Sequence, residues 1–193
     1  MDAALLAAAA TPEPGERLFE AGCGAGGALM QIALRRPGVQ LVGLERDSAA
    51  AALARQNADL NQVADRTQII SGDVSLGFKA LALAPFDWAV SNPPFFDDPG
   101  ALRAPAPGKQ AAWMADDGLQ AWTNLLLKSV KEGGKILIIH RADRLGDILQ
   151  LLAPKAGSFS VRPVQPFADT PAKRVLVKAV KTGKAPLQLL PPL

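Results

Sequence analysis

The stretch Asn92-Pro93-Pro94-Phe95 directly follows the apolar run 86–90, so a strand that ends there meets two adjacent prolines. Proline lacks an amide N–H and has φ fixed at about −65°, which stops the strand and stiffens its exit. The Asn92 side chain and the Pro93 carbonyl offer two converging acceptors. Such a pair suits the two N–H groups of a planar amino nitrogen and directs its lone pair towards an incoming methyl group. Phe95 or the phenylalanine after it could stack on a planar substrate; the alternative is a plain rigid exit with core phenylalanines.

The sequence EAGCGAGG at 20–27 is a glycine-rich turn between a predicted strand and a predicted helix. Gly22 and Gly24 allow the backbone to approach a ligand closely, and the helix after them presents free N–H groups. With Gly27 the stretch also satisfies G-x-G-x-x-G, so a nicotinamide or flavin dinucleotide is one possible ligand. Glu20 favours another cofactor, because a carboxylate repels pyrophosphate but suits an ammonium group, which S-adenosylmethionine carries.

Two acidic residues stand at the ends of the next two predicted strands. Glu45, about 20 residues beyond the glycines, is placed to accept both hydroxyls of a ribose, whereas Asp47 suits a helix cap. Asp73 follows the third strand, where it could bind the amino group of adenine or merely cap the next turn. Val74, Cys23 and Asn92 complete the predicted cofactor-binding positions. The Cys23 thiol itself is expected to be a small apolar filler and not a nucleophile.

These residues are positioned by short β-type runs that alternate with helical stretches. Strands nearly free of polar residues and separated by helices specify a parallel sheet covered on both faces. Helices are predicted over 2–10, 27–36, 47–61, 118–131 and 144–152. Strands are predicted over 17–21, 39–45, 67–72, 86–91, 135–140, 158–164 and 173–180.

The predicted fold is a Rossmann-like, doubly wound α/β sandwich with a seven-stranded, mostly parallel sheet. The loop 165–172 is too short for a helical crossover, so the last two strands should pair antiparallel. We expect one domain over 1–193, with an N-terminal helix and linker at 1–14. The Pro/Gly/Ala-rich loop 97–112 is typical of a lid or a disordered loop. In such a sheet the ligand lies beyond the carboxyl ends of the strands, where all the motifs above fall.

Composition excludes several classes of protein. A chain of 193 residues with 49% hydrophobic and 20% charged residues fits one domain with a sizeable core. No apolar run reaches the roughly 18 residues of a membrane span, and Asp2 stands where a signal peptide would be basic, so we expect a cytoplasmic protein. A single cysteine and a single histidine, Cys23 and His140, argue against disulfides, a metal site and a Ser-His-Asp mechanism.

Charge is distributed unevenly along the chain. Residues 1–127 carry 9 Lys and Arg against 14 Asp and Glu, whereas residues 128–193 carry 12 against 4. A basic half suits a polyanion such as nucleic acid, although a solvated surface would look the same. The candidates for phosphate contact are Arg103 and Lys109 in the lid loop and Arg162, Lys173, Arg174 and Lys178 near the last strands.

Three further residues have simple structural interpretations. His140 ends the fifth predicted strand, away from the asparagine motif, and Trp122 is expected in the core. Trp113 stands beside the lid loop and could touch the substrate.

The motifs together resemble class I S-adenosylmethionine-dependent methyltransferases of the subgroup that methylates planar amino nitrogens. FEAGCGAG, Glu45, GDV and NPPF occur in the family's order, and the match covers roughly residues 2–180. The specific element is [ND]-P-P-[FYW], which adenine-N6 and release-factor glutamine methyltransferases share. The resemblance implies that Asn92, Pro93, Pro94 and Phe95 hold the target nitrogen. It also implies that the cofactor is bound by Glu20, Gly22, Gly24, Glu45 and Asp73.

Within that subgroup the chain is similar to the bacterial family that methylates adenine N6 in valine tRNA. The similarity lies in the starting helix, the NPPFFD lid, GGKILIIHRADRL and KRVLVKAVK. It implies an RNA substrate. Members of that family usually have a segment before the Asp-x-x-Leu-Leu helix, whereas this chain begins at Met1-Asp2. We therefore expect an incompletely covered cofactor site or a shortened form.

Three alternatives remain open at this point. A protein glutamine amide could replace adenine as the substrate, although the basic C-terminal part argues against it. The chain could bind cofactor or RNA without turnover. A dinucleotide oxidoreductase rests only on Gly27 completing the glycine pattern.

Overall fold

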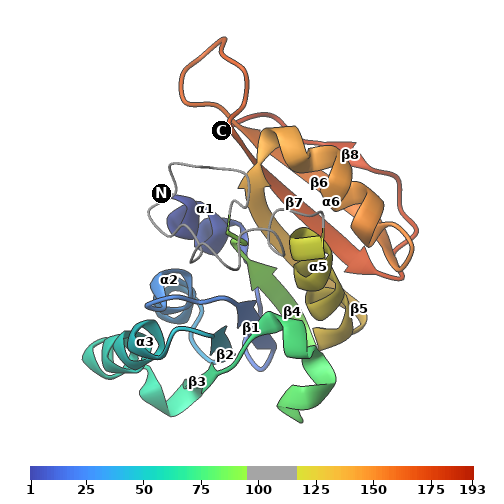
Figure 1. Ribbon diagram of the computed structural model, residues 1–193. Coiled ribbons are helices and arrows are strands. Elements are labelled where there is room, and N and C mark those ends of the chain that lie inside the picture. The colour runs from blue at the N-terminus through green and yellow to red at the C-terminus, as the bar shows by residue number, and fades with distance from the viewer. Residues whose placement is uncertain (95–116) are drawn as a thin grey trace, which may run out of the picture.

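The computed structural model describes residues 1–94 and 117–193, in which strands and helices alternate as the sequence predicts (Figure 1). The predicted lid loop 97–112 lies outside these residues. The described α-helices are α1 (Asp2–Ala9), α2 (Gly27–Arg35), α3 (Ser48–Leu60), α5 (Asp117–Ser129) and α6 (Leu145–Leu152). The strands are β1 (Arg17–Ala21), β2 (Gln40–Glu45), β3 (Thr67–Ser71), β4 (Phe86–Ser91), β5 (Val130–Arg141), β6 (Ala156–Val164), β7 (Arg174–Lys181) and β8 (Gln188–Leu189). Short 3-10 helices are η1 (Ala64–Arg66), η2 (Val74–Leu76), η3 (Phe78–Leu81) and η4 (Ala142–Arg144).

The strands form one mixed sheet in the order β3-β2-β1-β4-β5-β7-β6-β8. Strands β1 to β5 pair in parallel with one another, whereas β7 is antiparallel to both β5 and β6. The predicted antiparallel pairing of the last two long strands is therefore confirmed. The eighth strand was not predicted, because its two residues are too few to show an alternating pattern.

Helices cover both faces of the sheet, as Figure 1 shows. On one face α1, α2 and α3 pack their buried residues, such as Leu6, Ile32 and Ala54, against Leu41 and Trp88 of the strands. On the other face α5 and α6 bury a second set that includes the phenylalanines of β1 and β4. Within the two described ranges no helix is long and apolar enough to cross a membrane.

The end of α5 differs from the prediction, which ran the helix to residue 131. Helix α5 ends at Ser129, and Val130 already pairs with Phe86 of β4. The next paired residues are Trp88 and Lys135, so the segment between forms a bulge in β5. Gly133 has φ +74°, a left-handed conformation that glycine adopts without strain. The two glycines therefore shape a bulge and do not terminate a helix.

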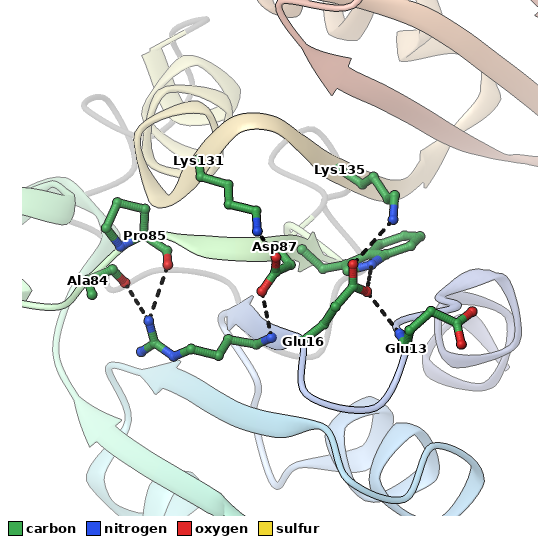
Figure 2. Close-up of polar contacts among 9 residues, drawn as sticks. Glu13, Glu16, Ala84, Pro85, Asp87, Lys131 and Lys135 are labelled. Carbon is green, nitrogen blue, oxygen red and sulfur yellow. Dashed lines mark hydrogen bonds and ion pairs between the residues drawn. The ribbon is translucent and has the colours of Figure 1, made fainter.

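The amino-terminal end of the sheet is fixed by polar contacts between β1 and β4 (Figure 2). The Arg17 amide N–H donates to Asp87 Oδ2 at 2.8 Å, and Lys131 forms an ion pair with the same carboxylate. Beside it, Glu16 accepts the Trp88 indole N–H at 3.0 Å and pairs with Lys135 at 3.5 Å. These contacts hold the starts of the two central strands in register, at the end of the sheet opposite the predicted site.

Replacing Asp87 with Asn should lower the free energy of unfolding by about 1–3 kcal/mol, the usual effect of losing hydrogen bonds to a buried charge. Burial raises the pKa of Asp87, but the contacts with Lys131 and the Arg17 N–H outweigh it, and the pKa stays below its usual value. Because the folded-state pKa is lowered, this stabilisation is present above the unfolded pKa of about 4 and is lost as pH falls through the folded value.

Urea unfolding at pH 7 and pH 3 would measure both effects. The control is Asp65→Asn, which removes an exposed carboxylate. Equal losses in the two variants at pH 7 would show that the Asp87 contacts add no stability.

Candidate functional site

The glycine turn after β1 has the conformation that only glycine adopts readily. Gly22 and Gly24 have φ +68° and +55°, and the Gly22 N–H donates to the Leu44 carbonyl at 2.8 Å. A Cβ on Gly22 would lie 2.8 Å from Cζ3 of Trp122, so the tryptophan ring packs directly on this turn. Backbone conformation and close packing therefore both require glycine at position 22.

Glu45, at the end of β2, joins the glycine turn to the start of α3. Its Oε2 accepts the Gly24 N–H at 2.8 Å, and its Oε1 accepts the Asp47 N–H at 2.8 Å. Asp47 itself caps α3 by accepting the N–H groups of Ala49 and Ala50, as predicted. Each Glu45 oxygen keeps a second lone pair for a ligand hydroxyl.

Asp73, after β3, caps the next turn and pairs with Arg46. Its Oδ1 accepts the Ser75 N–H at 2.9 Å, and its Oδ2 lies 3.3 Å from the Arg46 guanidinium. Burial raises the pKa of Asp73, but these contacts prevail and keep it below its usual value. The structure therefore shows Asp73 as the cap of the next turn, which is one of its two predicted roles. It leaves the carboxylate ionised beside the pocket.

Asn92 follows β4 at the point where the strand order reverses. Strand β4 is anchored next to it by the buried Ser91 hydroxyl, which donates to the Ala21 carbonyl at 2.9 Å. The Asn92 Oδ1 is buried and has no hydrogen-bond partner among the described residues. A buried amide oxygen without a partner costs free energy, and an N–H group of a ligand would satisfy it.

These elements enclose a pocket of about 270 Å³ at the carboxyl ends of β1 to β4, close to the lower bound of small-molecule sites. Carboxylates, an amide and glycine backbone line one side, and apolar side chains line the rest. The lining residues are Gly22, Gly24, Leu44, Glu45, Arg46, Gly72, Asp73, Val74, Asn92, Pro94 and Trp122.

Two predicted cofactor-binding residues, Glu20 and Cys23, do not line this pocket among the described residues. Glu20 is 3% exposed, and its Oε2 has no hydrogen-bond partner among the described residues. Burial raises the pKa of Glu20 to about 8, the Leu29 N–H lowers it and Glu45 raises it.

Cys23 is buried and fills space in the core, as predicted. A Cβ on Gly43 would lie 2.7 Å from the Cys23 Sγ, so the thiol packs directly on β2. Burial, with Glu20 and Glu45 nearby, raises the pKa of this thiol well above its usual value. It is therefore a poor nucleophile.

Sequence reasoning missed four residues of the pocket lining. Arg46 and Gly72 could have been found, since each adjoins a predicted strand end. Trp122 was expected only in the core, and Leu44 was not singled out from its predicted strand. Trp122 is indeed 9% exposed, but its ring forms a pocket wall because α5 crosses the end of β1.

The predicted phosphate-contact residues separate into two groups. Arg174 pairs with Asp2 of α1 at 2.9 Å, so its charge is partly balanced. Arg162 and Lys178 lie on neighbouring β6 and β7, and Lys173 is exposed just before β7. None of these three forms an ion pair with a described carboxylate. Arg103 and Lys109 lie outside the described residues, as do Phe95 and Trp113.

His140 lies buried at the end of β5 and does not line the pocket as described. Burial, followed by Arg144 and Arg141, lowers the pKa of His140 to about 4, so the imidazole is neutral near pH 7. In residues 1–94 and 117–193 no group of three or more His, Cys, Asp or Glu side chains is placed to hold a metal ion.

Comparison with known proteins assigns this chain to a protein family. The methyltransferase small domain family matches residues 2–104. The tRNA1(Val) (adenine(37)-N6)-methyltransferase of Dickeya chrysanthemi is 28% identical over 191 residues, covering 98% of this chain and 75% of that protein. A release factor glutamine methyltransferase of Chlorobaculum tepidum is 26% identical, covering 70% of this chain and 49% of that protein.

Solved structures agree with the sequence comparison. A predicted O-methyltransferase from Agrobacterium tumefaciens has a TM-score of 0.81 and 25% identity over 100% of this chain and 86% of its own. A methyltransferase from Geobacter sulfurreducens, solved with S-adenosylhomocysteine, has a TM-score of 0.51 and 28% identity, covering 72% of this chain and 47% of its own. The chain therefore belongs to the methyltransferase small domain family and is an S-adenosylmethionine-dependent methyltransferase.

Proposed function

We propose that this methyltransferase acts on the exocyclic N6 of adenine in RNA, with tRNA as its substrate. The observation that carries the proposal is the buried Asn92 Oδ1, which has no hydrogen-bond partner within residues 1–94 and 117–193 and belongs to a residue that lines the pocket with Pro94. An acceptor held in that way fits an N–H donor of a planar amino group. Phe95, the predicted stacking residue, lies outside the described residues and keeps that role as a prediction.

The residues of the pocket fit S-adenosylmethionine. The turn at Gly22 and Gly24 brings backbone within reach of the ligand, as it must for the amino-acid portion. The second lone pairs of the Glu45 oxygens suit the two ribose hydroxyls, and the ionised Asp73 suits the adenine amino group. When bound, the cofactor supplies an electrophilic methyl group on sulfur.

The protein's part in the transfer is positioning and exclusion of water. Asn92 accepts one N–H of the target amine and the Pro93 carbonyl accepts the other, which turns the nitrogen lone pair towards the methyl carbon. With the cofactor bound, the aligned nitrogen would form the new N–CH₃ bond as the S–CH₃ bond breaks, and the electron pair of the broken bond would stay on sulfur. The nitrogen then loses one proton to solvent, so no catalytic base is required.

RNA is favoured over protein by charge and by the relatives. The C-terminal part carries 12 Lys and Arg against 4 Asp and Glu, and Arg162, Lys173 and Lys178 are not balanced by described carboxylates. The Dickeya relative, which aligns with nearly the whole chain, is a tRNA adenine methyltransferase. We also propose that residues 1–193 form one methyltransferase domain, and the cytoplasmic location stays a prediction.

Glutamine is the second candidate, because release factor glutamine methyltransferases are also relatives. Incubation with radiolabelled cofactor and either total tRNA or a Gly-Gly-Gln peptide would separate the two. We expect label in the tRNA alone. Label in the peptide alone would replace adenine with the glutamine amide, and label in neither would remove both substrates.

If Glu20 contacts the cofactor's ammonium group, cofactor binding should release a proton. Glu20 is mostly protonated at pH 7, since its pKa is about 8, and a nearby ammonium favours the carboxylate. Affinity for S-adenosylhomocysteine should therefore rise about fivefold from pH 7 to pH 8 and level off above it. In Glu20→Gln this rise in affinity between pH 7 and pH 8 should disappear. Calorimetry in two buffers of different ionisation enthalpy measures the proton released; identical results for wild type and variant would refute the contact.

A further inference from the structure

We propose that the loop 165–173 between β6 and β7 is an RNA-binding element whose tip residue, Phe167, stacks on an unpaired base of the same RNA strand as the target adenine. The inference rests on the proposed RNA substrate and assigns the loop a role in binding it. It starts from one exposed aromatic ring. Phe167 is 75% exposed, whereas the other described phenylalanines, Phe19, Phe78, Phe86 and Phe159, are buried or partly buried in the core.

The loop lies at the same edge of the sheet as the pocket. Arg141, the last residue of β5, pairs with Arg174, the first of β7, so the β6–β7 loop leaves the carboxyl edge. Figure 1 shows it projecting beyond the rest of the molecule. Strand β6 is the third strand from β4 in the sheet order, and strands are about 4.8 Å apart. The base of the loop is therefore about 15 Å from Asn92 along that edge, a span that a single-stranded segment of RNA can cross.

The loop is held in one conformation by its own hydrogen bonds. The Thr170 hydroxyl donates to the Phe167 carbonyl at 2.7 Å, and the Gln165 side chain donates to the Thr170 carbonyl at 2.9 Å. At the base, the Lys173 N–H donates to the Val164 carbonyl at 3.0 Å. A ring presented on a braced loop loses little conformational entropy when a base stacks on it.

The charges at the base of the loop suit a phosphate backbone. Lys173 ends the loop, and Arg162 lies on β6 three residues before the loop begins. Neither forms an ion pair with a carboxylate in the part of the chain that the structure describes, and Asp169 is the one acid within the loop. An exposed aromatic ring flanked by cations is the combination with which proteins bind single-stranded nucleic acid.

The test is binding of a fluorescein-labelled tRNA1(Val) transcript at several salt concentrations. Phe167→Ala should weaken binding about five- to hundredfold, the range of base stacking, with an unchanged salt slope and unchanged affinity for S-adenosylhomocysteine. Lys173→Ala should instead make the salt slope shallower by about 0.7. Leu60→Ala removes an equally exposed apolar side chain from α3, and Lys155→Ala removes a cation from the opposite edge; neither should have an effect.

A gain-of-signal variant completes the test. Phe167→Trp should bind RNA as wild type does, and its added tryptophan emission should be quenched by the transcript. If wild type binds and methylates the transcript but Phe167→Ala behaves like Leu60→Ala, the loop assignment is wrong while the proposed function stands. If wild type neither binds nor methylates any tRNA, the proposed function fails and the loop assignment fails with it.

Discussion

Asn92→Ala should reduce methyl transfer by about 100- to 1000-fold, the usual loss when one positioned hydrogen-bonding group is removed from the reacting centre. The variant should still bind S-adenosylhomocysteine within about threefold of wild type. The reason is that the Asn92 Oδ1 has no partner within the described residues, so its removal breaks no hydrogen bond of this oxygen there. Single-turnover rates with tRNA and calorimetry with S-adenosylhomocysteine measure the two quantities separately.

Two further variants make this result specific. Asn124→Ala is the same substitution on the exposed side of α5 and should leave rate and affinity unchanged. Asn92→Asp keeps a carboxylate oxygen as acceptor and occurs in the related [ND]-P-P-[FYW] motif, so it should retain measurable transfer. A parallel loss of cofactor affinity in Asn92→Ala would assign the motif to the cofactor pocket and not to the target amine.

Glu45→Ala should weaken binding of S-adenosylhomocysteine about 100-fold or more and should also lower the melting temperature. The carboxylate holds the Gly24 and Asp47 N–H groups at 2.8 Å each, so its loss leaves two donors near the pocket without an acceptor. The proposed ribose contacts would disappear with them. Calorimetry gives the affinity, and thermal unfolding without ligand gives the structural part of the effect.

The 2′-deoxy analogue of S-adenosylhomocysteine separates the two roles of Glu45. If the carboxylate accepts the ribose hydroxyls, wild type should bind the analogue more weakly than the parent compound, and Glu45→Ala should bind the two alike. Glu13→Ala, an exposed substitution of the same type, is the control. Wild-type affinity in Glu45→Ala would contradict the ribose assignment.

The sequence predicted the strands that position the site to within a residue or two. Strands β1 and β4 match the prediction at both ends, because glycine and proline stop them and apolar residues fill them. The carboxyl-end rule for α/β sheets then placed Gly22, Glu45, Asp73 and Asn92 together, and all four line one pocket.

What the sequence could not predict depends on contacts between distant residues. The Trp122 ring packs on Gly22 because α5 crosses β1, and no local sequence pattern encodes this contact. The pairing of Arg46 with Asp73 joins two strand ends that are 27 residues apart. Likewise, the sequence did not show that Glu20, a predicted cofactor contact, is almost fully buried. Propensity describes single elements, whereas these features arise from how the elements pack.

The uneven charge along the sequence predicted only part of the basic surface correctly. Half of the basic residues after residue 127 form ion pairs within the described protein, among them Lys131, Lys181 and Arg174. The remaining cations include Arg162, Lys173 and Lys178, three of the predicted phosphate contacts. A count of charges therefore overstates the basic surface, and the paired and unpaired residues can be distinguished only in the folded protein.

The central claim is that the amine held by Asn92 is adenine N6 in tRNA. It is tested most directly by incubating the protein with an unmodified tRNA1(Val) transcript and trideuteromethyl-labelled cofactor, followed by digestion to nucleosides and mass spectrometry. We predict N6-methyladenosine carrying three deuterium atoms, formed about 100- to 1000-fold more slowly by Asn92→Ala and at the wild-type rate by Asn124→Ala. Deuterium label on another atom of the nucleoside would contradict this claim. So would an unlabelled tRNA under conditions in which a Gly-Gly-Gln peptide becomes labelled.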